Sequence, residues 1–207
     1  EEIKSNFELD ENAEITIEVN PGTVTLEKLE DYNKVGINRL SIGLQSTHEH
    51  LLKEIGRIHT YLDFLDTYRF AREADFENIN VDLMIGLPNQ TLAEVQDSIE
   101  EIVSMEPEHI SVYSLILEEG TPLFKKVEEG LELPDEELER KMYWTVKRIL
   151  EANGYNHYEI SNFAKQGYES KHNLDCWNQK EYIGFGVAAH SYTCLLYTSP
   201  SPRDISG

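Results

Sequence analysis

The chain has 207 residues and a formal net charge of −21, with 39 acidic against 18 basic residues. This length suits one large domain, or one domain and part of another, and the acidic balance argues against a nucleic-acid-binding protein, which would carry a basic face. The two cysteines form no disulfide framework, and no apolar run approaches the ~20 residues of a membrane span, so we expect a cytoplasmic protein.

The first part of the chain alternates between strand-like and helix-like patterns. Short β-branched or apolar runs predict strands at 15–19, 39–43, 79–88 and 109–115. Amphipathic patterns with capping residues predict helices at 26–35, 49–55, 61–74 and 91–105. Such alternation implies right-handed crossovers and a parallel sheet. Four strands are fewer than the eight of a closed barrel, so we expect an α/β fold, a partial (β/α) barrel whose N-terminal strands are missing.

The pattern changes after Gly120, where we expect an appended α+β region. A long helix is predicted from Asp135 to about Ala152, followed by a short strand at Tyr158–Ile160 and a loop at 161–179. The expected domains are therefore 1–120, the partial barrel, and 121–193, the appended region. Residues 194–207 lack periodicity and are either non-native or a natural disordered terminus.

Candidate functional positions lie near the ends of the predicted strands, at Glu18, 41–45, 82–86 and 114–117. In barrels of this kind the chemistry sits where strands end and the following loops begin. A carboxylate inside a buried strand is costly unless it is paired or hydrogen-bonded. Asp82 therefore either faces a ligand, caps a neighbouring helix or pairs with an arginine.

Several segments, in order and at matching spacing, resemble the radical S-adenosylmethionine family. In the first part of the chain these are Thr16–Pro21, Arg39–Ser46, Gly56–His59 and Val81–Pro88. Further along they are Tyr113–Leu115, Glu119–Leu123, Tyr158–Ala164 and His172–Trp177. The resemblance covers roughly residues 15 to 193 and is to the branch containing oxygen-independent coproporphyrinogen III oxidase and the HemW heme chaperones, with the later segments closer to the chaperones.

Two departures from the family pattern bear on function. Cys176 stands where these chaperones have a tyrosine. The Cys-x-x-x-Cys-x-x-Cys loop that holds the family's [4Fe–4S] cluster is not in this sequence, and neither Cys176 nor Cys194 has ligand spacing. We therefore expect a chain that is missing its N-terminal part and cannot ligate the cluster by itself.

The resemblance implies contacts to S-adenosylmethionine. Glu18 matches the carboxylate that contacts the cluster-bound molecule; alternatively it pairs with Arg39 or Lys34. In the oxidase, a second S-adenosylmethionine is contacted at the positions that match Gln45, Arg57 and Asp82, and Ile116 is expected near the same site. Arg57 and Asp82 have an alternative as a structural ion pair, and Ile116 would offer only its backbone.

The resemblance also implies heme binding, for which His172 is the candidate iron ligand, because heme iron accepts a neutral imidazole. The alternative is a solvated or hydrogen-bonded loop histidine. Residues 184–186 match a cofactor-facing loop or form a tight packing turn. We expect structural roles for His59 and His190, and exposure for the remaining candidates, His48 and His50.

Three functions remain open. The leading one is a heme chaperone that binds heme, S-adenosylmethionine and a [4Fe–4S] cluster and delivers heme to enzymes; any membrane contact would then come through an acceptor. The second is oxygen-independent coproporphyrinogen III oxidase, an oxidoreductase of porphyrin biosynthesis, although the net charge of −21 does not favour an anionic tetracarboxylate substrate. The third is a partial-barrel enzyme with an Asp82–Arg57 site and no radical chemistry.

Overall fold

The computed structural model describes residues 2–193, and the tail expected at 194–207 lies outside the described residues. The chain divides into two compact units, Glu1–Glu169 and Ser170–Gly207, each described by itself. The domain limits expected at Gly120 and Thr193 stay a prediction. Within residues 2–193, no helix has both the length and the apolar character needed to cross a bilayer.

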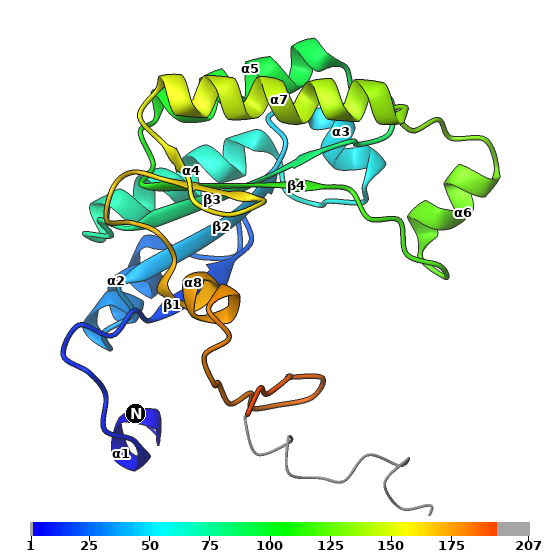
Figure 1. Ribbon diagram of the computed structural model, residues 1–207. Coiled ribbons are helices and arrows are strands. Elements are labelled where there is room, and N and C mark those ends of the chain that lie inside the picture. The colour runs from blue at the N-terminus through cyan, green and yellow to red at the C-terminus, as the bar shows by residue number, and fades with distance from the viewer. Residues whose placement is uncertain (1, 194–207) are drawn as a thin grey trace, which may run out of the picture. The chain divides into compact units, whose positions relative to one another are not determined.

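The first unit is built on a six-stranded sheet with strand order β1-β2-β3-β4-β6-β5 (Figure 1). Its strands are β1 (Thr16–Val19), β2 (Arg39–Gln45), β3 (Ile79–Ile85), β4 (His109–Ser114), β5 (Asn156–His157) and β6 (Asn162–Ala164). The first four are mutually parallel, whereas β6 runs antiparallel to both β4 and β5. The predicted α/β class and the four parallel strands are confirmed.

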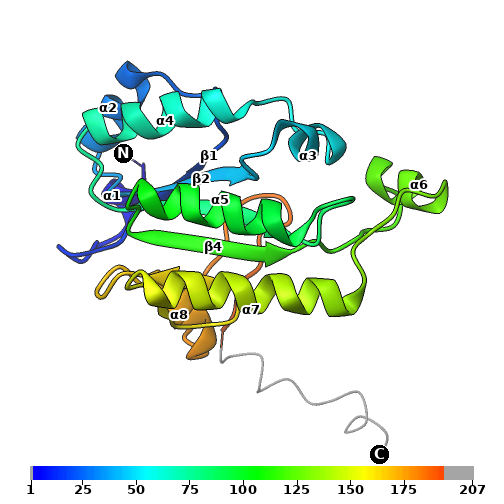
Figure 2. The same cartoon turned by 90° about the horizontal axis from the view of Figure 1, so that it is seen from above.

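Helices cover one face of this sheet, and Figure 2 shows α4, α5 and α7 lying side by side along it. The helices of the first unit are α1 (Glu2–Asn6), α2 (Leu26–Lys34), α3 (Glu49–Glu54), α4 (Tyr61–Glu73), α5 (Leu92–Ser104), α6 (Pro122–Glu128) and α7 (Glu136–Ala152). Side chains alternate between the faces of a strand. Alternate residues of the strands and one side of four helices form a single apolar core, which includes Leu40, Val81, Ile110, Leu29, Phe64, Ile99 and Val146.

The opposite face of the sheet is polar. It carries Arg39 and Ser41 from β2, Asn80 and Asp82 from β3, and His109 and Ser111 from β4; of these Asp82 is half-buried and the others are buried. The sheet thus has helices on one face and a row of hydrogen-bonding side chains on the other, as the interior of a partial barrel requires.

The expectation for the segment after α7 was wrong in part. Tyr158–Ile160 is not a strand but part of the bend between β5 and β6, which pair with Asn156 opposite Ala164. Phe163 is the buried residue that anchors this hairpin, whereas Ile160 is 62% exposed. The predicted loop at 161–179 contains β6 and, in the second unit, α8 (Lys171–Trp177), and the sequence reasoning also missed α6. These elements are shorter than the windows in which periodicity is informative.

The capping box predicted at the start of α5 is confirmed. The Thr91 side chain accepts from the Glu94 backbone N–H, and the Glu94 carboxylate accepts from the Thr91 backbone N–H at 2.8 Å. We expect Thr91→Ala to lower the free energy of unfolding by about 1 kcal/mol, since it removes the side-chain half of the cap. Urea denaturation measures this, and Thr91→Ser, which keeps the hydroxyl, should lose much less; equal losses would contradict the capping role.

Candidate functional site

Asp82 sits in the middle of β3 on the polar face of the sheet. Ser41 Oγ donates to Asp82 Oδ2 at 3.1 Å, and Asn80 Nδ2 donates to Asp82 Oδ1 at 2.8 Å. Burial raises the pKa of the Asp82 carboxyl above its usual value, and the donors around it and the positive charge of Arg39 oppose that rise. The carboxylate is thus held by two side chains rather than by the arginine or helix terminus considered from the sequence.

Three segments converge at the end of β2. Arg57, in the loop before α4, donates from Nη1 to Asn20 Oδ1 at 3.0 Å, just beyond β1. A Cβ built on Gly43 would lie 3.1 Å from Gln45 Nε2 and 3.5 Å from Asn20 Oδ1, so both amides fill the space over this glycine. Gly43 is also the register partner of Asp82. The structure therefore brings the predicted residues Gln45, Arg57 and Asp82 together around one glycine.

Gln45 has an uncommon backbone conformation for its residue type. Its φ is 75°, in the left-handed region, and the β2–β3 register shifts between Gly43 and Gln45. Its side chain is buried, with 8% exposure. Backbone bulges of this kind redirect a side chain at a strand end and are common beside functional sites.

Glu18 lies on the same polar face as Asp82. It is the register partner of Ser41, whose hydroxyl donates to Asp82, and side chains of register partners in parallel strands share a face. Its side chain is exposed. Lys34, one of the two residues considered as an ion-pair partner of Glu18, instead pairs with Glu30 and Asp31. Glu18 and Asp82 therefore lie on the same face of the sheet and close in register.

The alternative of an Arg57–Asp82 ion pair finds no support in the partners of either residue. Arg57 is bonded to Asn20, and Asp82 to Ser41 and Asn80. Ile116 follows β4 with a side chain that is 80% exposed, which is compatible with a role for its backbone alone.

His172 is an exposed residue of α8 in the second unit. Its Nε2 lies 3.7 Å from Cys176 Sγ, and its ring meets Tyr182 edge-on, with centroids 5.9 Å apart. Gly184 has no room for a side chain, because a Cβ there would clash with the backbone carbonyl of His190. This observation favours the tight-turn interpretation of residues 184–186.

The other histidines divide into buried and surface residues. His59 is buried, and its Nε2 lies 3.1 Å from the Leu44 carbonyl, in line with the structural role expected for it. His190 and His50 are exposed, but His50 pairs with Glu94 at 3.0 Å. His48 is only half-exposed, and its Nε2 lies 3.3 Å from the Glu94 carbonyl, so the expectation of a simply exposed residue was wrong for it.

The sequence did not predict the buried polar residues that surround Asp82 on the same face of the sheet. His109 has no exposed surface, and its two ring nitrogens lie 2.6 Å from Asn80 Oδ1 and 2.7 Å from Tyr158 Oη. Burial, together with the charge of Arg39, lowers the pKa of His109 to about 3. The signal was available in the alternation of polar and apolar residues along 109–114, which marks a strand with one polar face.

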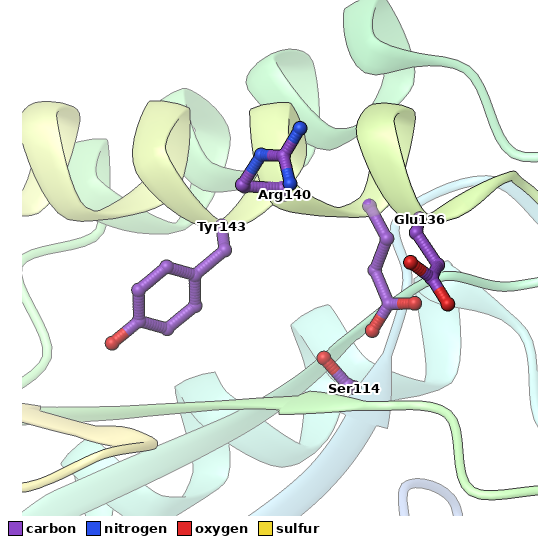
Figure 3. Close-up of a pocket in the computed structure, with 5 residues that line it drawn as sticks. Ser114, Glu136, Arg140 and Tyr143 are labelled. Atoms are coloured by element: carbon purple, nitrogen blue, oxygen red, sulfur yellow. The ribbon is translucent and has the colours of Figure 1, made fainter.

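A separate open pocket of about 300 Å³ lies at the end of β4 under α7. Figure 3 shows Glu136 and Tyr143 extending from the side of α7 that faces Ser114, with the hydroxyl end of Tyr143 directed away from Ser114, while Arg140 points to the other side of α7. Val112 and Ser114 alternate with the polar-face residues of β4, so this pocket is on the helix side of the sheet. The pocket is therefore distinct from the Asp82 cluster. Of the positions that the sequence singled out, it contains one, Ser114 at the end of the predicted strand.

Metal-ligating groups are not assembled in the described part of the chain. Among residues 2–193, no group of three or more histidine, cysteine, aspartate or glutamate side chains is arranged to hold an ion. Cys176 is exposed and unpaired with another cysteine. The described residues do not fit a [4Fe–4S] cluster, which takes several cysteine thiolates.

Comparison with known proteins agrees with this geometry. Residues 1–102, which include Glu18, Gln45, Arg57 and Asp82, match the model of the radical SAM superfamily. The chain is 47% identical over 181 residues to the heme chaperone HemW of Bacillus subtilis, covering 87% of this chain and 48% of that protein. It is 40% identical over 191 residues to the heme chaperone HemW of Lactococcus lactis, covering 92% and 50%.

The fold comparison extends further along the chain. The solved structure of coproporphyrinogen III oxidase (HemN) from Escherichia coli, described as a radical SAM enzyme, superposes with a TM-score of 0.75 at 23% identity. That match covers 92% of this chain and 46% of the oxidase, and at this identity it shows the fold alone. The chain spans about half the length of the curated relatives it matches. By the match of residues 1–102 to the family model, the chain belongs to the radical SAM superfamily.

Proposed function

We propose that this chain forms part of a HemW-like heme chaperone that binds S-adenosylmethionine on the polar face of its sheet and heme through its second unit. The main support for the S-adenosylmethionine site is the position of Gln45, the Arg57–Asn20 pair and Asp82 around Gly43. The relatives named as heme chaperones, at 47% and 40% identity, support the heme part of the proposal.

The side chains on the polar face suit the functional groups of S-adenosylmethionine. The molecule carries an ammonium, a carboxylate, a sulfonium and ribose hydroxyls. An arginine fork such as Arg57 holds a carboxylate, while carboxylates such as Asp82 and Glu18 hold an ammonium or hydroxyls. Glu18 would hold one molecule, at the iron–sulfur cluster; Gln45, Arg57, Asp82 and the backbone of Ile116 would hold a second. When bound to a reduced cluster, S-adenosylmethionine supplies radical chemistry, for which the protein orients the molecule and excludes water.

His172 is the proposed heme ligand. Its imidazole is exposed, its ring lies edge-on to that of Tyr182, and the one partner of its Nε2 among the described residues is a weak one, the Cys176 thiol at 3.7 Å. Delivery of heme to heme-requiring enzymes, a cytoplasmic location and a cluster held by residues outside the described ones belong to the same proposal.

A hemin titration followed by the Soret band tests the heme part. We expect the wild-type protein to shift the Soret band on binding and His172→Ala to lose that shift, because the axial nitrogen is gone. His50→Ala, which removes another exposed histidine, should leave the spectrum as in the wild type. An unchanged spectrum with His172→Ala would contradict this ligand.

The oxidase remains the alternative on the same scaffold, since fold likeness does not separate two activities. Anaerobic turnover of coproporphyrinogen III under reducing conditions would support it over the chaperone. The net charge of −21 argues against that anionic substrate unless a local basic pocket overrides it.

A further inference from the structure

A chain of hydrogen bonds with a fixed direction runs from Tyr158 to Asp82. Asn80 Nδ2 donates both to Asp82 Oδ1 and to Ser41 Oγ, each at 2.8 Å. The amide cannot be turned over, because its oxygen would then face the carboxylate, and neither is a donor. Asn80 Oδ1 therefore points the other way and accepts, at 2.6 Å from His109 Nδ1 and 3.0 Å from Ser111 Oγ.

The position of the proton on His109 follows from this orientation. A bond of 2.6 Å to Asn80 Oδ1 requires a hydrogen on Nδ1, since the amide oxygen only accepts. In a neutral imidazole Nε2 is then the acceptor, and it takes the hydrogen of the Tyr158 hydroxyl at 2.7 Å. Burial lowers the pKa of His109 to about 3, which keeps this ring neutral at physiological pH.

Each oxygen of Asp82 accepts one hydrogen bond from a neighbouring side chain on the polar face: Oδ1 from Asn80 and Oδ2 from Ser41. An ionised carboxylate has about four acceptor sites, so about two remain for a ligand. The direction in which those sites point is set by the two donors, and the Asn80 donor is itself held by His109.

We propose that Tyr158 and His109 are positioning residues, which hold Asn80 and through it the Asp82 carboxylate in the orientation that receives S-adenosylmethionine. This proposal rests on the proposed function, in which Asp82 contacts that ligand. Tyr158 lies in the bend between β5 and β6, so the antiparallel strands at the edge of the sheet act on a site in its parallel part.

Removing the Tyr158 hydroxyl has a defined consequence. The buried Nε2 of His109 is left as an acceptor without a donor, and a hydrogen moved onto it would find no acceptor, so the ring loses one of the two hydrogen bonds that hold it. His109 Nδ1 still donates to Asn80 Oδ1, but the ring is no longer held at Nε2, so Asn80 and its hydrogen bond to Asp82 are positioned less firmly. Tyr158→Phe should therefore weaken S-adenosylmethionine binding about five- to tenfold, the effect of one buried hydrogen bond.

Equilibrium dialysis of S-adenosylmethionine against wild type, Tyr158→Phe, Asp82→Asn and a matched control tests the proposal. The control is Tyr155→Phe, which removes the hydroxyl of a buried tyrosine three residues away that donates to the Pro107 carbonyl at 2.7 Å. It should bind as tightly as the wild type. In parallel, ¹⁵N NMR should find the hydrogen of His109 on Nδ1 in the wild type, with Nε2 as an acceptor, and should show the loss of the hydrogen bond at Nε2 in Tyr158→Phe.

The outcomes separate this proposal from the proposed function. Unchanged binding by Asp82→Asn would overturn the ligand contact itself. Weakened binding by Asp82→Asn with wild-type binding by Tyr158→Phe would overturn only the positioning role, as would equal losses with Tyr158→Phe and Tyr155→Phe. If Tyr158→Phe does not fold, the wild-type spectrum decides, since a hydrogen on His109 Nε2 contradicts the hydrogen-bond chain.

Discussion

Lowering the pH from 6.5 to about 4.5 is expected to reduce the free energy of unfolding by roughly 2 to 3 kcal/mol through His109 alone. The folded-state pKa of about 3 is depressed from the ordinary value of 6.5, mainly by burial and also by the charge of Arg39. Between pH 6.5 and about pH 3, His109 is protonated in the unfolded chain but stays neutral in the folded protein. The stabilising contribution is therefore complete above pH 6.5 and is lost as the pH falls towards 3.

Other groups that face His109 change the size of this effect but not its sign. The positive charge of Arg39 adds to the lowering of the His109 pKa. Asp82 acts in the opposite direction, because burial raises its folded-state pKa. Its contribution to stability is complete below its unfolded pKa and is lost as the pH rises through the folded pKa, so it offsets part of the acid loss.

Urea denaturation at several pH values, for the wild type and His109→Gln, measures this contribution. The glutamine amide can still donate to Asn80 but cannot titrate. The difference between the two slopes below pH 6.5 should be about 1.4 kcal/mol per pH unit. Parallel slopes would contradict the prediction, as would an NMR titration of His109 with a midpoint near 6.5; the second measurement needs only the wild-type protein.

Replacing Arg57 by glutamine is expected to weaken S-adenosylmethionine binding roughly 10- to 100-fold. A charge-assisted hydrogen bond contributes about 1.5–3 kcal/mol, and each 1.4 kcal/mol is about tenfold in affinity. Asn20 Oδ1 accepts one Nη1 hydrogen at 3.0 Å and so orients the guanidinium without neutralising it. The remaining donors are those assigned to the ligand carboxylate.

The same dialysis measurement compares Arg57→Gln with Arg69→Gln as the control. Arg69 is a surface residue of α4 whose guanidinium pairs with Asp66 at 2.9 Å. Asn20→Ala should fall between the two, since it removes the orientation but keeps the charge. Equal affinity in wild type and Arg57→Gln would show that the ligand carboxylate is held elsewhere.

Local sequence patterns were sufficient for the elements that carry the site. The β-branched run before Asn20, the short apolar run at 39–43 and the capping box at Thr91 each predicted an element that the structure confirms. These are properties of a few consecutive residues, governed by backbone conformation and side-chain periodicity. The hairpin at 156–164 escaped prediction because its strands have two and three residues, and its burial depends on packing against β4.

Sequence by itself determined the order of the first four strands and of the helices between them, and with it a parallel sheet whose strand ends meet at one edge. Only the tertiary structure decided which side chains bond there. Arg57 and Asn20 are 37 residues apart, His109 and Asn80 are 29 apart, and His109 and Tyr158 are 49 apart. A hydrogen bond needs its two atoms within about 3 Å, so each pair forms only if strand register and crossover path bring the two residues together. No local sequence pattern encodes register or crossover path.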